Sequence, residues 1–172
     1  MTERELIPVN IAIMTVSDSR TEETDTSGAA LVSRLLDAGH TLAEKVIVAD
    51  DIYKIREVMS RWISDPAIFT IISTGGTGLT GRDITPEAVK PLLDKEIDGI
   101  GELFRWLSYQ EILTSTVASR ALGGVANGTF IFCLPGSTGA CRTGWDAIIG
   151  PQLDYRNRPC NMVELMPRLL EE

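Results

Sequence analysis

Four segments of the chain combine residue types that are suited to binding an anion. They are residues 17–20, 50–51, 74–83 and 135–139. Glycines in them let backbone N–H groups approach an anion closely, and hydroxyl side chains add further donors. Arg20, Arg82 and Arg142 lie within or just after three of these segments and add positive charge. Together these residues predict a site for a phosphorylated ligand.

The longest segment, residues 74–83, matches two known glycine patterns only in part. Gly76, Gly78 and Gly81 fit GxGxxG, but the dinucleotide fingerprint needs its last glycine inside the following helix, and Pro86, the helix signal, comes later. The segment also starts like a P-loop, yet Arg82 and Asp83 stand where Lys-Ser/Thr is required. We therefore expect neither a Rossmann dinucleotide site nor a P-loop.

One acidic residue of this segment, Asp83, is a candidate ligand for a metal ion. Thr85 is the better cap for the helix that follows, which leaves Asp83 free for another role. Carboxylate oxygens suit Mg²⁺, and a nucleotide would supply the remaining ligands. For Asp50, Asp51 and Ser137, by contrast, spacing alone favours plain helix caps.

Other catalytic arrangements find little support in the sequence. His40 is the only histidine and follows Gly39 at an expected helix end, which is typical of a surface residue. Neither a Ser-His-Asp triad nor a clustered zinc site is expected. Cys141 lies near an expected helix N-terminus, a position that can lower the pKa of a thiol, but a packed structural thiol is the simpler interpretation.

The elements that must position these segments alternate along the chain. We expect strands at residues 9–16, 45–48, 67–73 and 129–134, and helices at 27–39, 52–63, from 85, at 102–113, 116–122 and 137–149. The strands are apolar on both faces, which favours a parallel sheet between two layers of helices. Right-handed crossovers then bring the strand-to-helix loops to one edge, where ligands bind.

The overall composition is that of one compact domain. With 172 residues, 44% of them hydrophobic, we expect a single domain over residues 1–172, with residues 151–172 as an irregular C-terminal tail on the body or on a neighbouring subunit. A net charge of −8 argues against nucleic acid and anionic membranes as partners. Three cysteines without disulfide or metal spacing, with neither a signal peptide nor a membrane-spanning run, favour the cytoplasm.

The glycine-rich segment also carries a family resemblance. Residues 74–87 read Thr-Gly-Gly-Thr-Gly-Leu-Thr-Gly-Arg-Asp-Ile-Thr-Pro-Glu and closely resemble the signature of the MogA/MoaB family of molybdenum cofactor biosynthesis proteins. Segments that look like the same family, in the same order, are residues 15–20, 25–28, 99–105, 119–120 and 134–137. Residues 154–161 are similar to the bacterial MoaB subgroup. The resemblance implies a three-layer α/β/α fold with a mostly parallel sheet, and assembly into trimers or hexamers.

The resemblance also implies an activity and a set of site residues. The best-understood members of the family are molybdopterin adenylyltransferases, which use Mg-ATP to transfer AMP to the terminal phosphate of molybdopterin. By resemblance, Asp50 and Asp83 are the catalytic residues and the ligands of Mg²⁺. The positions that it implies for binding molybdopterin and ATP are Ser17, Thr74, Gly75, Gly76, Thr77, Gly78, Arg82, Glu102, Arg105, Ser119, Arg120, Pro135, Gly136 and Ser137.

Three functions fit the resemblance to different degrees. Some MoaB-type relatives depart from the adenylyltransferase pattern at acidic or arginine positions, whereas this chain keeps Asp50, Arg82, Asp83 and Thr85, which favours an active enzyme. A non-catalytic molybdopterin-binding paralogue or carrier, working with other proteins of the pathway, is the alternative. A nucleotide hydrolase is disfavoured by the incomplete P-loop. The MoaB-like tail favours a hexamer over a trimer.

Overall fold

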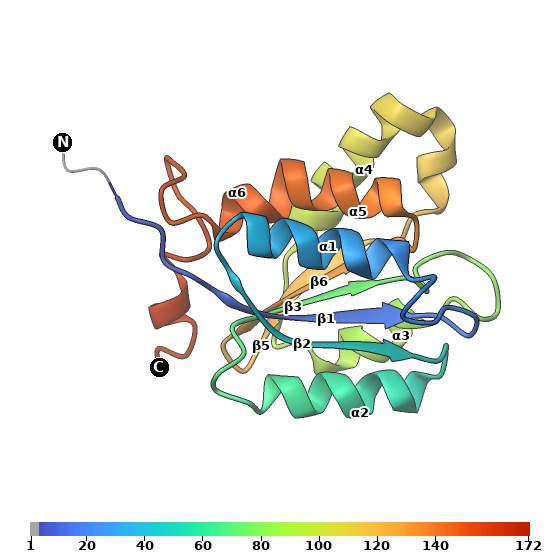
Figure 1. Cartoon of the computed structure of the whole chain (residues 1–172), viewed down its shortest axis with the longest axis horizontal. Helices are drawn as coiled ribbons and strands as arrows, with labels where there is room; N and C mark the ends of the chain where they lie inside the picture. The colour runs from blue at the N-terminus through green and yellow to red at the C-terminus, as the bar shows by residue number, and fades with distance from the viewer. Residues whose placement is uncertain (1–3) are drawn as a thin grey trace.

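The computed structural model of the protein describes residues 4–172, within which six strands form one sheet in the order β2-β1-β3-β6-β5-β4 (Figure 1). The strands are β1 (Asn10–Val16), β2 (Thr41–Val48), β3 (Thr70–Thr74), β4 (Lys95–Glu96), β5 (Leu122–Ala126) and β6 (Thr129–Leu134). β2, β1, β3 and β6 are parallel, whereas β5 runs antiparallel to both of its neighbours. The sheet is therefore mostly parallel, as predicted.

Helices cover both faces of the sheet. They are α1 (Thr26–Asp37), α2 (Ile52–Ile63), α3 (Thr85–Val89), α4 (Asp98–Ile112), α5 (Thr138–Gly144) and α6 (Gly150–Leu153), with a π-helical turn at Trp145–Ile149 between the last two. α1, α4, α5 and α6 lie on one face, and α2 and α3 on the other (Figure 1). This is the predicted three-layer α/β/α architecture. Among residues 4–172, no helix combines the length and the apolar character needed to span a bilayer.

Strand β1 illustrates why both faces of the sheet need cover. Ile11 and Ile13 pack in a buried cluster with side chains of α1 and α4, while Ala12 and Met14 pack in a second cluster with side chains of α2 and α3. All four side chains are fully shielded from solvent. A strand with apolar partners on both sides has no polar face, so the run of apolar residues in the sequence follows from its central position.

The helix caps agree only in part with the sequence. Asp51 caps α2, as the capping interpretation predicts. Ser27, which opens the helix predicted for residues 27–39 and could have capped it, is not its cap: the carboxylate of Asp25 accepts the N–H of Gly28 and caps α1. The Ser27 hydroxyl donates instead to the carbonyl oxygen of Gly136, in the loop after β6. The hydroxyl therefore joins the first turn of α1 to the loop after β6.

The helix predicted for residues 116–122 is wrong. A short 3-10 helix (Leu113–Ala118) ends before this segment does, and the chain then enters β5. Gly123 and Gly124 lie inside this strand rather than ending a helix. A Cβ on Gly123 would lie 2.7 Å from the side chain of Ile100, so glycine is what allows α4 to pack directly on the strand.

The C-terminal segment lies against the body of the protein. Leu153, Met162 and Val163 are buried in the same cluster as α1 and α4. The irregular tail starts later than the predicted residue 151, because α6 continues to Leu153; after it, the described chain forms turns and one short 3-10 helix (Met166–Arg168). The tail was expected to lie on the body or on a neighbouring subunit, and these buried residues pack on the body.

The prediction that His40 is a surface residue is wrong. Its side chain is buried, and its Nδ1 accepts the backbone N–H of Val9 at 3.1 Å. Burial lowers the pKa of His40, because an apolar environment disfavours the charged imidazolium. The histidine therefore holds the chain that enters β1.

Candidate functional site

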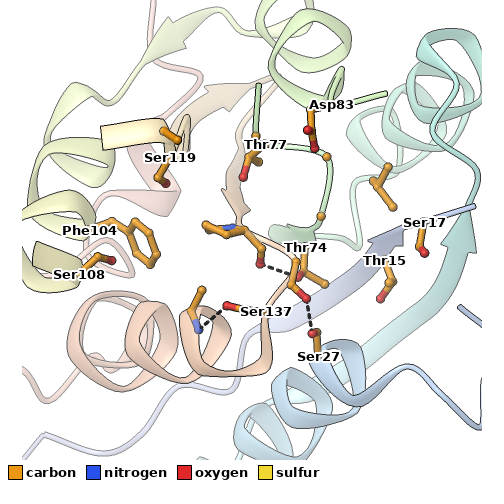
Figure 2. A pocket seen from close by; sticks show the side chains of 18 of the residues that line it. Thr15, Ser17, Ser27, Thr74, Thr77, Asp83, Phe104, Ser108, Ser119 and Ser137 are labelled. Carbon is orange, nitrogen blue, oxygen red and sulfur yellow. Dashed lines mark hydrogen bonds between the residues drawn. The ribbon is translucent and has the colours of Figure 1, made fainter. Parts of the chain in front are cut away.

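A cavity of about 440 Å³ lies beyond the carboxyl ends of β1, β3 and β6 (Figure 2). The parallel strands bring these ends to one edge of the sheet, where the sequence predicts the site. The predicted residues that line this cavity are Ser17, Thr74, Gly75, Gly76, Thr77, Gly78, Asp83, Ser119, Pro135, Gly136 and Ser137. Segments far apart in the sequence thus meet around one hollow.

The glycine loop after β3 requires glycine at two positions. Gly75 and Gly76 have φ angles of +100° and +68°, in the left-handed region that side chains disfavour. A Cβ on Gly76 would also overlap Oγ1 of Thr85, whose hydroxyl donates to the carbonyl of Gly75 at 2.8 Å. The prediction that Thr85 caps α3 is therefore wrong: Ile84 precedes that helix without a side-chain cap, and Thr85 anchors the loop.

The loop after β6 is tied to the glycine loop by two hydrogen bonds. The N–H of Gly75 donates to the carbonyl of Leu134 at 3.0 Å, and Oγ1 of Thr74 donates to that of Pro135 at 2.9 Å. Ser137 caps α5, as predicted, and it also lines the cavity, where a predicted binding residue is expected. The two loops therefore form one continuous wall.

A buried carboxylate supports the cavity on the β1 side. Asp25 lines the cavity, but its side chain is only 1% exposed and pairs with Nζ of Lys45 at 2.9 Å. It also accepts the hydroxyl of Thr15 at 2.8 Å and the N–H of Gly28 at 2.9 Å. Although burial raises the pKa of a carboxyl, these donors together bring the pKa of Asp25 below its usual value. Asp25 is therefore a fixed, ionised anchor.

Asp83 presents an ionised carboxylate at the cavity. Its Oδ2 accepts the hydroxyl of Thr80 at 2.7 Å and the backbone N–H of the same residue at 2.9 Å. These hydrogen bonds, led by the one from the Thr80 hydroxyl, lower the pKa of Asp83. Figure 2 shows its side chain at the cavity, next to the glycine loop.

Asp50 lies outside the cavity lining, in an acidic region beside it. Burial raises the pKa of Asp50, and the negative charges of Asp18 and Asp83 raise it further. Arg82 does not line the cavity either, because its Nε and Nη2 donate to Oδ2 of Asp18 at 2.9 and 2.5 Å. Among residues 4–172, no group of three or more His, Cys, Asp or Glu side chains is arranged to hold a metal ion.

Three of the predicted substrate-binding residues lie around a second cavity, of about 680 Å³. These are Glu102, Arg105 and Arg120, while Ser119 lines both cavities. Nη1 of Arg105 donates to the carbonyl of Ala121 at 2.9 Å. The structure therefore divides most of the predicted set between two adjoining cavities, while Asp50 and Arg82 line neither of them.

Sequence reasoning missed one wall of the first cavity. α4 and the 3-10 helix after it contribute Phe104, Ser108, Ile112, Ser115, Thr116 and Ala118. These mixed polar and apolar residues follow no spacing that marks a site, so the sequence offered no signal for them. The sequence did contain a signal for Asp25 as a site residue, because residues 25–28 form one of the segments that resemble the family. Of the three arginines first singled out, Arg20 lines this cavity.

Comparisons with known proteins agree with this fold. The family described as "Probable molybdopterin binding domain" matches residues 12–155. Molybdenum cofactor biosynthesis protein B of Escherichia coli (strain K12) is 55% identical over 157 residues, which cover 91% of this chain and 92% of that protein. A crystal structure of a molybdenum cofactor biosynthesis protein B has a TM-score of 0.84 at 44% identity, covering 87% of this chain and 94% of that one. The tungsten cofactor synthesizing protein MoaB from Pyrococcus furiosus has a TM-score of 0.75 at 35% identity, with 83% and 91% covered.

The chain therefore belongs to the MogA/MoaB family of molybdenum cofactor biosynthesis proteins. The relatives just named are MoaB proteins, which confirms the resemblance to that subgroup.

Proposed function

We propose that this protein is a molybdopterin adenylyltransferase, which transfers AMP from Mg-ATP to the terminal phosphate of molybdopterin. The observation that carries the proposal is the first cavity, in which the glycine loop, several hydroxyl side chains and Asp83 surround one hollow. Backbone N–H groups and hydroxyls bind phosphate oxygens, and an ionised carboxylate beside them attracts a cation. A nucleotide with its divalent ion meets both conditions.

The proposed reaction is a displacement at the α-phosphorus of ATP. An oxygen of the molybdopterin phosphate forms the new bond to phosphorus, and the opposite bond breaks to release pyrophosphate. The step needs no nucleophile from the protein. The free loop N–H groups and the hydroxyls of Ser17 and Ser137 would orient the phosphates and stabilise the charge that develops, so catalysis is positioning and electrostatics.

Asp50 and Asp83 would hold the Mg²⁺ of Mg-ATP. Burial and the charge of Asp18 raise the pKa of Asp50 most, and the charge of Asp83 adds a smaller effect in the same direction, so a bound cation would offset negative charge here. Mg²⁺ is commonly bound by one or two carboxylates together with phosphates and water, so this pair fits the ion. When bound, Mg²⁺ neutralises phosphate charge.

The decisive experiment compares Asp83→Asn with the control Asp37→Asn. Asp37 is exposed and is the last residue of α1, at the opposite end of this helix from Ser27, which lines the cavity. Each protein is incubated with Mg-ATP and molybdopterin, and adenylylated pterin and pyrophosphate are measured beside nucleotide affinity. We expect Asp83→Asn to reduce turnover by about 100-fold or more, with a smaller effect on binding, and the control to match the wild type. Unchanged turnover in Asp83→Asn would refute the assignment.

The same assay separates the alternatives. A non-catalytic carrier binds molybdopterin but yields neither adenylylated pterin nor pyrophosphate. A nucleotide hydrolase releases free nucleoside diphosphate without modifying the pterin. The adenylyltransferase proposal requires a pterin adduct and pyrophosphate in equal amounts.

We further propose that copies of this chain assemble through α4, into a trimer or hexamer. The large apolar side chains exposed on this helix and on the 3-10 helix that follows are Leu103, Trp106, Tyr109, Ile112, Leu113 and Val117. Exposed apolar groups that lie close together are typical of association surfaces. Contacts with other proteins of the pathway are a further expectation, and the use of ATP agrees with the cytoplasmic location expected from the sequence.

A further inference from the structure

The carbonyl groups of residues 75–78, the first part of the glycine loop, all accept hydrogen bonds from residues outside the loop. Thr85 binds two of them, through its hydroxyl to Gly75 O at 2.8 Å and through its N–H to Gly76 O at 2.9 Å. Arg120 binds the next two, through its backbone N–H to Thr77 O at 3.0 Å and through its Nε to Gly78 O at 2.8 Å. Four consecutive carbonyls are thus held by only two residues.

This anchoring determines which way the loop's donors face. In a trans peptide the C=O of one residue and the N–H of the next point in opposite directions. The loop lines the first cavity, but neither Thr85 nor Arg120 does, so both anchors hold the carbonyls on the side away from the cavity. Among residues 4–172, no protein acceptor is hydrogen-bonded to the N–H of Gly76 or of Thr77, which leaves these two donors for a ligand.

The side chain of Arg120 has a second task in the same loop. Its Nη2 donates to the carbonyl of Asp83 at 2.7 Å, while its Nε holds that of Gly78. These carbonyls are the two ends of the turn that carries the Asp83 carboxylate. Nη1 is paired with Glu87 at the rim of the second cavity. The planar guanidinium therefore bridges the two ends of the turn by hydrogen bonds to both carbonyls.

We propose that Arg120 is a positioning residue, which sets the Asp83 carboxylate and the glycine loop through two backbone carbonyls rather than by touching the substrate. The proposal rests on the proposed function for the role of Asp83, and it differs from the substrate-binding role that the family resemblance implies for Arg120. Lysine cannot replace arginine here, because a single ammonium cannot span both carbonyls in the fixed geometry of the fork.

The first measurement is Mg-ATP affinity, by calorimetry, in the wild type, Arg120→Lys and Arg120→Gln. Positioning predicts a loss of about tenfold in both variants, the scale of one lost hydrogen bond to a charged group, because both lose the bridge. Contact of the charge with substrate predicts that Arg120→Lys retains affinity and only Arg120→Gln loses it. The control is Glu87→Gln, which removes an exposed ion pair but leaves both carbonyl contacts, and we expect affinity within about twofold of the wild type.

The second measurement tests whether Arg120 acts through Asp83. If part of its effect acts through the Asp83 carboxylate, Arg120→Lys weakens Mg-ATP binding by a clearly smaller factor in the Asp83→Asn background than in the wild type, because residues that act as a unit are not additive. Multiplied effects of the two substitutions would overturn the proposal.

The third measurement needs no ligand and keeps the two proposals apart. In the wild type, the N–H of Thr80 donates to Asp83 and that of Asp83 donates to Thr80 O, so both amides report the turn. We expect hydrogen exchange at these amides to accelerate about tenfold in Arg120→Lys, with the amides of β1 unchanged, and to stay at the wild-type rate in Glu87→Gln. Unchanged exchange in Arg120→Lys would overturn the positioning role. If the wild type binds no Mg-ATP, the adenylyltransferase proposal fails, and this measurement alone decides the role of Arg120.

Discussion

The substitution Gly76→Ala is the most direct perturbation of the candidate site, because one added methyl group meets two separate obstacles. The left-handed φ of +68° costs an L side chain about 1–2 kcal/mol. The new Cβ would overlap Oγ1 of Thr85 and displace its hydroxyl from the carbonyl of Gly75, which costs about 1–3 kcal/mol for a buried acceptor left unpaired. We expect a total loss of about 2–5 kcal/mol, a large part of the stability of a typical domain.

The assay is urea unfolding combined with nucleotide binding, with Gly81→Ala as the matched control. Gly81 lies in the same loop, but a Cβ there would have no atom within 4 Å. We expect the control to unfold within about 1 kcal/mol of the wild type. Gly76→Ala should also weaken Mg-ATP binding by at least about tenfold, because the loss of one hydrogen bond between the loop and the ligand changes affinity by about that factor. A Gly76→Ala protein with wild-type stability and affinity would refute this reading of the loop.

Two further predictions concern the buried anchor and the association surface. Asp25→Asn should destabilise the protein by about 3 kcal/mol at pH 7, because Lys45 loses its buried partner. The pKa of Asp25 is lowered in the folded protein, so its stabilisation is complete above the unfolded-state pKa and is lost as the pH falls through the folded-state pKa. In urea unfolding, the difference in free energy of unfolding between Asp25→Asn and the wild type should therefore shrink in acid. A difference that does not change with pH would contradict this. Trp106→Glu should lower the mass measured by sedimentation, whereas Tyr53→Glu, on the opposite face, should not; an unchanged mass in Trp106→Glu would exclude α4 as the association surface.

Much of the fold could be predicted because its physical causes are local. Strands such as β1 and β6 are predominantly apolar on both faces, which favours a central place in the sheet. The turn from β3 into residues 75–78 is equally visible, since a run of glycines permits backbone angles that other residues avoid. The error at β5 has a non-local cause. Gly123 lets α4 approach the strand, and Gly124 leaves room for the side chain of Leu93, so both glycines reflect packing and not the strand itself.

The candidate site divides in the same way. The types of its residues, and the expectation that loops after parallel strands meet at one edge, come from the sequence. The depth at which Asp25 is buried, and the wall contributed by α4, depend on which helix covers which strand end. Such contacts join residues far apart in the chain, and their spacing carries no periodic signal.

The sequence by itself determined the family, the layered architecture and the presence of a phosphate-type glycine loop, because these depend on side-chain chemistry and on backbone freedom. Only the tertiary structure decided that Arg82 is bound by Asp18 and that Arg120 grips backbone carbonyls. The reason is physical. Every residue carries the same backbone carbonyl group, so no sequence pattern predicts which carbonyl an arginine side chain will bind.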